Sequence, residues 1–264
     1  MTASQRSGRL RKILNLPGLL FIIALLAVWE LVVRLGIVEL VFLPAPSEIF
    51  LSFTDVLGSG QLIEDLLHTL SVALLGWLIG GVVGVALGTL LGVSPLVWRY
   101  SMATIDLLRS IPAITFISVA ALLFGLSRQM ELVVTVYAAL WPILINTIEG
   151  FRKIQPLYFE TGKIMQMSRG KVVTKIMIPA AAGSIIVGLR LGLGLALTLA
   201  VAAEMVGNPR GMGYQLIMQQ QALNPAAMFV YILAIGLVGV ILNRMFLWTV
   251  AIVKPGIALS LRED

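Results

Sequence analysis

The sequence predicts an all-α membrane protein with about six transmembrane helices. Of its 264 residues, 59% are hydrophobic and only 12% are charged, and the mean hydropathy is +0.99. Soluble domains typically carry about 25% charged residues. The apolar residues also gather in runs of about 20 residues, the length of helix that crosses a bilayer. Lipid is therefore the expected solvent for most of this chain.

The apolar runs place the predicted spans along the chain. They are residues 17–35, 67–93, 102–124, 132–148, 184–206 and 228–252. The basic residues before the first run are typical of a signal peptide, but no small-residue cleavage site follows the run, so we expect a retained helix. Two prolines and a serine near the start of residues 43–66 predict an interfacial helix between the first two spans.

Three parts follow from these spans. Residues 1–61 are expected to form an N-terminal tail, the first span and an outer interfacial segment. Residues 62–252 are expected to form the transmembrane core, and residues 253–264 a C-terminal tail. No low-complexity segment and no second, soluble domain is predicted.

Lysine and arginine predict the orientation of the spans. With six spans, the basic residues before the first span, in the loop between the fourth and fifth, and after the sixth fall on one side of the membrane. The opposite side has only Arg34, Arg128 and Arg210, together with several acidic residues. Because positively charged loops tend to remain in the cytoplasm, both termini are predicted to be cytoplasmic.

The composition excludes several kinds of chemistry. The chain has no cysteine, so it forms no disulfide and no thiolate metal site. His68 is the only histidine, which argues against a multi-histidine metal site or a catalytic triad. We expect His68 to be an interfacial residue where the second span enters the membrane. No catalytic residue, metal or cofactor is predicted in this chain.

Two further partners are not expected to bind the chain directly. The net charge of +6 comes from residues that flank apolar runs, so a nucleic-acid partner is not predicted. The phosphate-binding pattern GxxxxGK[ST] does not occur, so the chain is not expected to hydrolyse ATP through such a loop.

Small residues recur along two of the predicted spans. The second span has five glycines spaced four residues apart, and the fifth span continues the same spacing with two glycines followed by Ala196 and Ala200. Such stripes let helix backbones approach closely in a membrane. Bundle packing is the simplest interpretation, and a sliding surface between moving helices is the alternative. The glycines are Gly76, Gly80, Gly84, Gly88, Gly92, Gly188 and Gly192.

Charged residues inside the spans indicate a candidate pathway, because a charge within the bilayer is costly and is usually functional or paired. Arg109 lies in the third span, where Pro112 is expected to bend the helix and free backbone carbonyls. Arg190 lies about 15 Å from the cytoplasmic side at 1.5 Å per residue, a depth similar to that of Arg109. The two arginines either line a cavity that attracts anions or form structural ion pairs, such as Arg109 with Asp106 or either with Glu149.

Glu204 lies near the outer end of the fifth span. It is interpreted either as a gate element or as a partner for backbone groups where the helix meets the next loop. That loop, GNPRGMGYQL at residues 207–216, is glycine-rich but has no phosphate-binding pattern. We expect an ordered outer loop that serves as a gate or as a docking surface for an external partner.

The loop between the fourth and fifth spans is the most informative segment. Pro156 suits the first turn of a helix, and Ser168 can cap a second short helix that Pro179 stops. Two short helices with a sharp break would form a knuckle on the cytoplasmic side. The alternative is a surface loop whose charge only sets orientation. The tip of the knuckle has residue types that suit a protein interface: Met165, Met167, Ser168 and Arg169.

This segment resembles the coupling motif of ABC importer permeases, which reads E-A-A, three residues, G, nine residues, then I-x-L-P. The spacing of the chain agrees throughout, with Gln166 in place of the motif glycine. Glycine often supplies a positive φ at such a bend, so the geometry at Gln166 is open. The residues at the motif positions are Glu160, Thr161, Gly162, Gln166, Ile176, Ile178 and Pro179.

Other segments resemble the nitrate, taurine and aliphatic-sulfonate subfamily of these importers, some relatives of which carry bicarbonate. The segments are LPAPSEIF, RSIPAITF, GLRLGLGLA, VAAEMVG and GMGYQL. The resemblance implies the type I ABC importer permease fold, with a cytoplasmic coupling helix between the fourth and fifth spans. It also implies a pore-forming subunit rather than an enzyme, in the cytoplasmic (inner) membrane of a prokaryote.

The resemblance further implies the partners and the mechanism. They are a second copy of the chain as a homodimer, two cytoplasmic ATP-binding subunits that hold ATP and Mg, and an external substrate-binding protein. ATP binding would close the ATPase pair, and the knuckle would transmit that movement to the membrane helices. The cargo would be a small anion of the sulfonate, taurine or nitrate type. An ion-driven secondary transporter and a non-transporting membrane scaffold are the alternatives.

Overall fold

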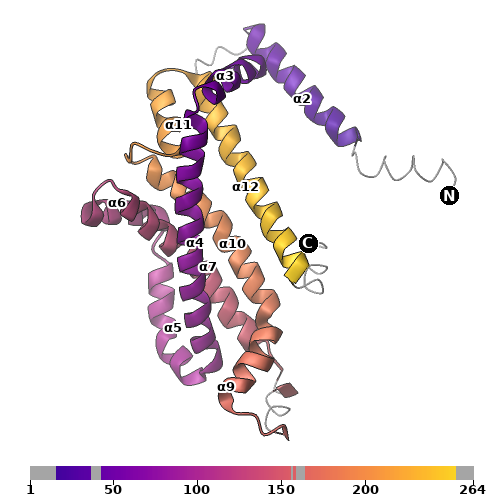
Figure 1. Ribbon diagram of the computed structural model, residues 1–264, viewed down its shortest axis with the longest axis vertical. Helices are drawn as coiled ribbons and strands as arrows, with labels where there is room; N and C mark the ends of the chain where they lie inside the picture. Colours follow the sequence, from indigo (N-terminus) through magenta and orange to yellow (C-terminus); the bar gives the residue numbers. More distant parts are fainter. Residues whose placement is uncertain (1–15, 37–42, 156, 159–163, 254–264) are drawn as a thin grey trace, which may run out of the picture. The chain divides into compact units, whose positions relative to one another are not determined.

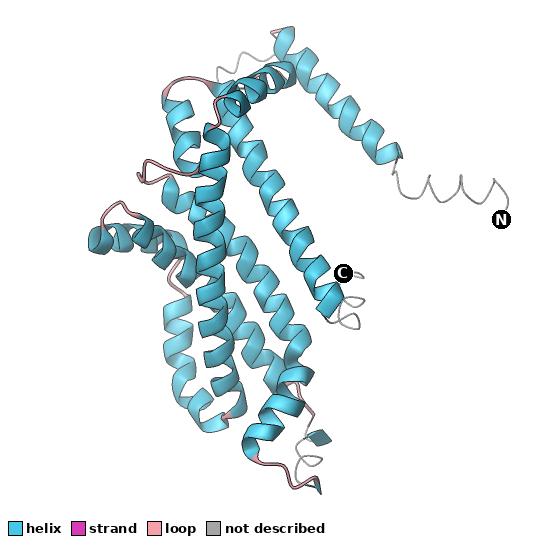
Figure 2. Cartoon of the chain, in the orientation of Figure 1, coloured by secondary structure: helices cyan, strands magenta, loops and turns pink. Residues whose placement is uncertain are grey.

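The computed structural model describes residues 16–36, 43–155, 157–158 and 164–253. Every regular element in these ranges is a helix (Figures 1 and 2), which confirms the predicted all-α class. The helices are α2 (Leu16–Arg34), α3 (Pro46–Gly58), α4 (Gln61–Val93), α5 (Pro95–Arg109), α6 (Ala113–Phe124), α7 (Arg128–Arg152), α9 (Arg169–Val172), a π-helical turn (Val173–Met177), α10 (Ile178–Glu204), α11 (Met212–Gln221) and α12 (Pro225–Val253).

Four helical segments in the described ranges are long and apolar enough to cross a bilayer. They are α4, α7, the continuous helix Arg169–Glu204 and α12. The bent pair α5 and α6 provides a fifth candidate. The predicted first span coincides with α2, a helix of 19 residues, which is not among these candidates.

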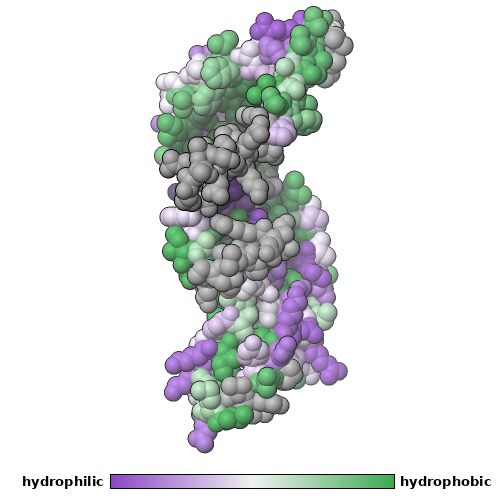
Figure 3. Space-filling model, turned by 90° about the vertical axis from the view of Figure 1, so that its right-hand side faces the viewer, coloured by the Kyte–Doolittle hydropathy of each residue, from purple (hydrophilic) through white to green (hydrophobic). Residues whose placement is uncertain are grey.

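The chain forms two compact units. The smaller unit is Met1–Gln61 with Leu216–Ile232, and the larger unit is Leu62–Gln215 with Leu233–Asp264. In Figure 3, hydrophilic side chains gather in the lower half of the view, toward the end of the larger unit that carries α9 in Figure 1. The larger unit contains the features that bear on function.

In the smaller unit, a glutamate joins α2 to α3. The Glu30 carboxylate accepts hydrogen bonds from the backbone N–H of Ser47 at 3.0 Å and from its hydroxyl at 2.7 Å. The two prolines and Ser47 were predicted to mark the start of a helix here. The helix begins at Pro46, in agreement, and the Glu48 carboxylate accepts from the Ala45 N–H at 3.1 Å. Glu30 thus satisfies polar groups in the first turn of α3, which have no partner within the helix.

The larger unit is built around α7, which lies between α4 and α10. The α4 glycines face α7 so closely that a Cβ atom on Gly76 would lie 2.4 Å from Thr135, and one on Gly88 would lie 2.6 Å from Thr147. On the other side, a Cβ atom on Gly192 would lie 2.7 Å from Ile143. Both predicted glycine stripes therefore serve helix packing, and they bring two helices into contact with the same third helix.

The remaining glycines of the stripes make the same kind of contact with α7. A Cβ atom would lie 2.6–2.9 Å from an α7 atom at three of them, a separation that real side chains essentially never show, and at a tight 3.0 Å at Gly80. These glycines are Gly80, Gly84, Gly92 and Gly188.

The third predicted span is broken. Helices α5 and α6 meet at an angle of 83°, and Pro112 precedes the first residue of α6. This is the position at which the proline was expected to bend the helix. The Tyr137 hydroxyl donates to the carbonyl of Leu108 at 2.7 Å and to that of Ile111 at 3.3 Å. The carbonyls freed by the break thus find a donor on α7.

We predict that replacing Gly88 by alanine destabilises the larger unit by about 1–3 kcal/mol, because the new methyl group overlaps Thr147 and the helices must separate. The thermal unfolding midpoint of the purified protein would measure this loss. Gly183 is the matched control, since a Cβ atom there meets nothing within 4 Å. Gly183→Ala should leave the midpoint unchanged or raise it, because alanine favours helix. Equal midpoints for the two variants would contradict the packing role of the stripe.

Candidate functional site

The tip of the predicted coupling segment contains an unusual backbone conformation. Gln166 has φ +50°, and Leu223 is the only other non-glycine residue with positive φ in the part of the chain that the structure describes. Left-handed backbone costs a non-glycine residue about 1–2 kcal/mol. Gln166 stands where the motif has glycine, so the chain keeps the left-handed bend with a residue that adopts it at a cost. The sequence alone left this point open.

Residues around this bend border a groove of about 570 Å³. The side chain of Met165 is 65% exposed at its edge, and Met167 and Tyr158 also line the groove. The opposite wall comes from Lys175, Ile176, Pro179 and Ala180. Of the predicted coupling residues, Glu160, Thr161 and Gly162 lie outside the described residues.

The second short helix predicted in this segment does not stop at Pro179. The carbonyl of Ser168 accepts from the Val172 N–H at 3.0 Å, and from Arg169 one helix continues to Glu204 over 36 residues. Pro179 lies in the first turn of α10, directly after the π-helical turn. A proline lacks the N–H that an unbroken α-helix would need there, and the wider turn before it changes the hydrogen-bond register. The expected stop was therefore wrong.

This continuous helix gives the coupling segment a rigid connection across the larger unit. At 1.5 Å per residue, 36 residues extend about 54 Å, which exceeds the roughly 30 Å hydrocarbon thickness of a bilayer. Arg169 lies at one end, beside the bend at Gln166, and Glu204 lies at the other. The helix thus begins three residues after the bend and extends to Glu204.

Glu204 is fully buried at its end of this helix. Its Oε2 atom accepts hydrogen bonds from the Gly213 N–H at 2.9 Å and the Thr69 hydroxyl at 3.0 Å. Gly211, with φ +97°, packs directly on the carboxyl group, since a Cβ atom there would lie 2.3 Å from Glu204 Cδ. Of the two interpretations offered for Glu204, this geometry matches hydrogen bonding to the following loop.

A second buried glutamate holds the same loop from α7. Glu131 is fully buried. It binds His68 Nε2 through Oε2 at 2.9 Å, and its Oε1 accepts from the side-chain amide of Asn208. The histidine side chain is only 12% exposed, so its interpretation as a lipid-interface residue was wrong. A carboxylate 63 positions away supplies its partner, which local sequence could not show.

We call this set of residues the polar latch. Two further contacts come from α4. The Asp65 carboxylate accepts from the Gly211 N–H at 3.1 Å, and the Thr69 hydroxyl accepts from the Met212 N–H at 3.0 Å. Together these contacts fasten residues 208–213 to α4, α7 and α10. Buried carboxylates are costly without partners, and the loop N–H groups donate to these acids, although Glu204 Oε1 has no hydrogen-bond partner among the described residues. The latch consists of Asp65, His68, Thr69, Glu131, Glu204, Asn208, Gly211, Met212 and Gly213.

Sequence reasoning found only part of the latch. Glu204 was singled out, but Asp65 and Glu131 were not, although each lies near the start of a long apolar helix. An acid in the first helical turn is common because it complements the helix dipole, so its position gave no distinctive signal. No group of three or more acidic or histidine residues suited to hold a metal occurs among the described residues.

The two candidate pathway arginines line different cavities. Arg109 lies at the end of α5 and forms an ion pair with Asp106 at 2.9 Å, which is the structural alternative considered for it. Arg190 lies on α10, where its Nε donates to Asn243 of α12 at 2.9 Å. It lines a cavity of about 160 Å³. Neither forms an ion pair with Glu149, whose carboxylate lies 3.5 Å from Lys153.

Comparison with known families agrees with this architecture. Residues 80–258 match the binding-protein-dependent transport system inner membrane component family. The chain belongs to this family. It is therefore a transport component of an inner membrane rather than an enzyme, and the helices α4 to α12 that carry the stripes, the latch and the coupling segment fall largely within the match.

Individual relatives point the same way. The chain is 30% identical over 224 residues to the permease protein SsuC of Bacillus subtilis, named for aliphatic sulfonates transport, and the match covers 85% of this chain and 81% of that protein. It is 28% identical to the bicarbonate transport system permease protein CmpB of Synechocystis, with 96% of this chain and 93% of that protein covered.

The fold also matches a solved structure. The inward-facing MetNI methionine ABC transporter superposes with a TM-score of 0.57 at 18% identity, covering 71% of this chain and 97% of that one. The chain thus has the type I ABC importer permease fold that its sequence implied.

We predict that Gly211→Ala opens the polar latch, because the added methyl group overlaps the Glu204 carboxyl and should cost about 1–3 kcal/mol. Trypsin cleavage after the exposed Arg210 should then become faster in the purified protein. Gly125→Ala is the matched control, since Gly125 also has positive φ, at +67°, but a Cβ atom there meets nothing within 4 Å. Equal cleavage after Arg210 in both variants would show that residues 208–213 are not held by this contact.

Proposed function

We propose that this chain is the membrane permease of an ATP-driven importer for a small oxyanion of the sulfonate, nitrate or bicarbonate type. The solute class is supported by relatives named for aliphatic sulfonates and for bicarbonate. Taurine, a sulfonate, falls within the same class. Two copies of the chain would form the pore, with two cytoplasmic ATPase subunits that bind ATP and Mg and one external substrate-binding protein.

The observation that carries this proposal is the left-handed bend at Gln166. It stands at the motif position where importer permeases have glycine, and it leads directly into the helix Arg169–Glu204. In the proposed mechanism, residues 156–170 sit in a groove of the ATPase subunit and move when ATP closes the ATPase pair. The helix transmits this movement to the end held by the polar latch, so the two sides of the membrane open alternately.

The charge pattern supports the proposed orientation. The bend is followed by Arg169, Lys171 and Lys175, which belong on the cytoplasmic side by the distribution of basic residues. The polar latch then lies on the outer side, where an external binding protein would dock. Both termini are cytoplasmic in this arrangement.

The coupling proposal is tested with the permease, its ATPase and its binding protein reconstituted in proteoliposomes. Uptake of taurine, nitrate and bicarbonate should require ATP and stop with vanadate.

Gln166→Val should reduce uptake at least about tenfold, because a β-branched residue rarely adopts positive φ and a strain of about 1.4 kcal/mol corresponds to that factor. Gln166→Gly is the matched control and should retain uptake. Unchanged uptake by Gln166→Val would reject the coupling role, and uptake driven by an ion gradient without ATP would favour a secondary transporter.

The pathway proposal is tested through Arg190 in the same system. Arg190→Gln should lower the rate of anion uptake while leaving assembly with the ATPase intact, because an intramembrane charge that attracts anions is lost. Arg99→Gln removes the same charge from an exposed position on α5 and should transport normally. If Arg190→Gln also transports normally, the arginine serves only its hydrogen bond to Asn243.

A further inference from the structure

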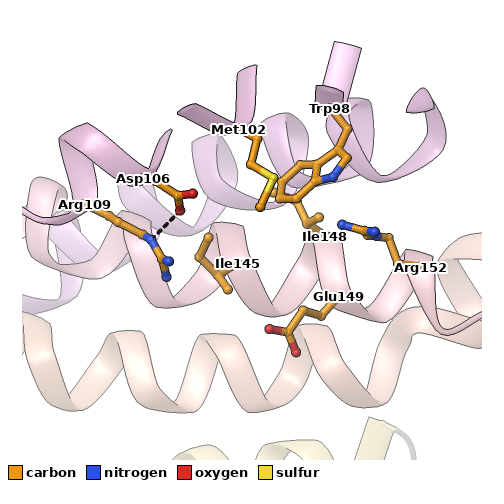
Figure 4. Close-up of a pocket in the computed structure, with 8 residues that line it drawn as sticks. All are labelled: Trp98, Met102, Asp106, Arg109, Ile145, Ile148, Glu149 and Arg152. Carbon is orange, nitrogen blue, oxygen red and sulfur yellow. Dashed lines mark ion pairs between the residues drawn. The ribbon is translucent and has the colours of Figure 1, made fainter. Parts of the chain in front are cut away.

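The cavity that contains Arg109 differs from a simple anion site. It has a volume of about 200 Å³ and lies between α5 and α7. Figure 4 shows Arg109 and Asp106 at one end, Arg152 beside Trp98 at the other, and Glu149 on the α7 side. Two guanidinium groups and two carboxylates thus line one space. Their formal charges cancel, so an anion entering the cavity would meet as much repulsion as attraction.

The charged groups in the cavity retain capacity to bind a ligand. The guanidinium of Arg152 lies over the Trp98 ring, 4.9 Å from its centroid, and among the described residues it forms no ion pair with a carboxylate. Arg109 uses its Nε–H to bind Asp106, and a guanidinium has five N–H donors in all. The Glu149 carboxylate lies 3.5 Å from Lys153 Nζ, and its side chain is 56% exposed.

The aromatic contact holds one of these groups in place. A guanidinium stacked on an aromatic ring is fixed in orientation while its edge N–H groups remain free to donate to an oxyanion. The cavity volume of about 200 Å³ is about seven times the roughly 30 Å³ that one water molecule occupies. That is room for a small organic ion rather than a single water or a metal ion.

We propose that this cavity binds a small zwitterion in which an oxyanion and an ammonium group are joined by a short linker. The oxyanion is held by the Arg152 guanidinium beside Trp98, and the ammonium group by Glu149, three residues before Arg152 on α7. A ligand that is neutral overall but dipolar matches a cavity with balanced charges, since each end meets its opposite. Two sources share this chemistry: free taurine, and the ethanolamine phosphate headgroup of a phospholipid.

The position of the cavity supports both sources. Trp98 and Arg152 lie near the start of α5 and the end of α7, the ends assigned to the cytoplasmic face by charge. Arginine and tryptophan at a membrane interface are typical partners of lipid headgroups. A solute bound at this position would be one that has just crossed the membrane. Assignment of the site to a transported solute therefore rests on the proposed function, whereas assignment to a lipid headgroup does not.

The test is direct binding to the full-length chain, purified in detergent without ATP. Taurine titration by calorimetry and native mass spectrometry of retained phosphatidylethanolamine distinguish the two sources. Arg152→Gln should weaken binding of whichever of these two ligands the unaltered protein binds by about tenfold or more. This is the effect of one lost charge-assisted hydrogen bond. Arg99→Gln, one residue from Trp98 but outside the cavity, should bind as the unaltered protein does.

Ligand class is tested with ethanesulfonate, which lacks the ammonium group, and with an anionic phospholipid, which lacks it as well. The unaltered protein should bind taurine more tightly than ethanesulfonate, or phosphatidylethanolamine more tightly than the anionic phospholipid. Glu149→Gln should abolish that preference. Saturable binding of taurine assigns the site to a solute, and binding of phosphatidylethanolamine assigns it to lipid. Binding of neither, equal binding of the ammonium-free ligands, or equal loss in Arg99→Gln would overturn the proposal. Since no transport is measured, a failed uptake experiment leaves this result unaffected.

Discussion

The larger unit depends on the close approach of α4 and α10 to α7. Lipid provides no hydrophobic force that drives one apolar helix onto another, so contact must come from fitted surfaces. The glycines supply that fit, because a side chain at Gly76, Gly88 or Gly192 would overlap α7. Threonine and isoleucine side chains of α7 fill the space that the glycines leave. Three helices are thereby fixed relative to one another by close packing.

The polar latch is possible only because of this packing. Glu131 on α7 and Glu204 on α10 reach the same loop from different helices, and Thr69 on α4 completes the set. Carboxylates buried in an apolar bundle need donors. Residues 208–213 provide them as backbone N–H groups and an amide side chain. An extramembrane loop thus becomes ordered by acids that are individually unfavourable in the bundle.

The same bundle connects the latch to the coupling segment. The helix from Arg169 to Glu204 passes through one π-helical turn at Val173–Met177 and tolerates Pro179 directly after it. Such turns are frequent at functional sites, where they change helix register without ending the helix. The left-handed bend at Gln166 precedes it by only a few residues. Backbone irregularity is therefore concentrated where the proposed ATPase partner would act, while the remainder of the helix is regular.

The sequence by itself determined the helical membrane class, the positions of most spans and the glycine stripes. These are periodic or spacing signals, which depend on neighbours within a few residues and remain readable without a fold. It also located the break at Pro112, because the missing N–H and the ring of proline act locally. It did not find Tyr137, which supplies the donor for the freed carbonyls from another helix.

Only the tertiary structure decided which charges meet. His68 pairs with Glu131, and Asp65 binds the Gly211 N–H, across many intervening residues. The sequence around one residue of each pair does not predict its partner. The conformation of Gln166 was likewise beyond the sequence, since glutamine rarely takes positive φ and does so only where surrounding structure compensates the strain. Long-range polar contacts and strained backbone are properties of the assembled bundle. The sequence specifies the helices, and their packing specifies the partners of the buried charges.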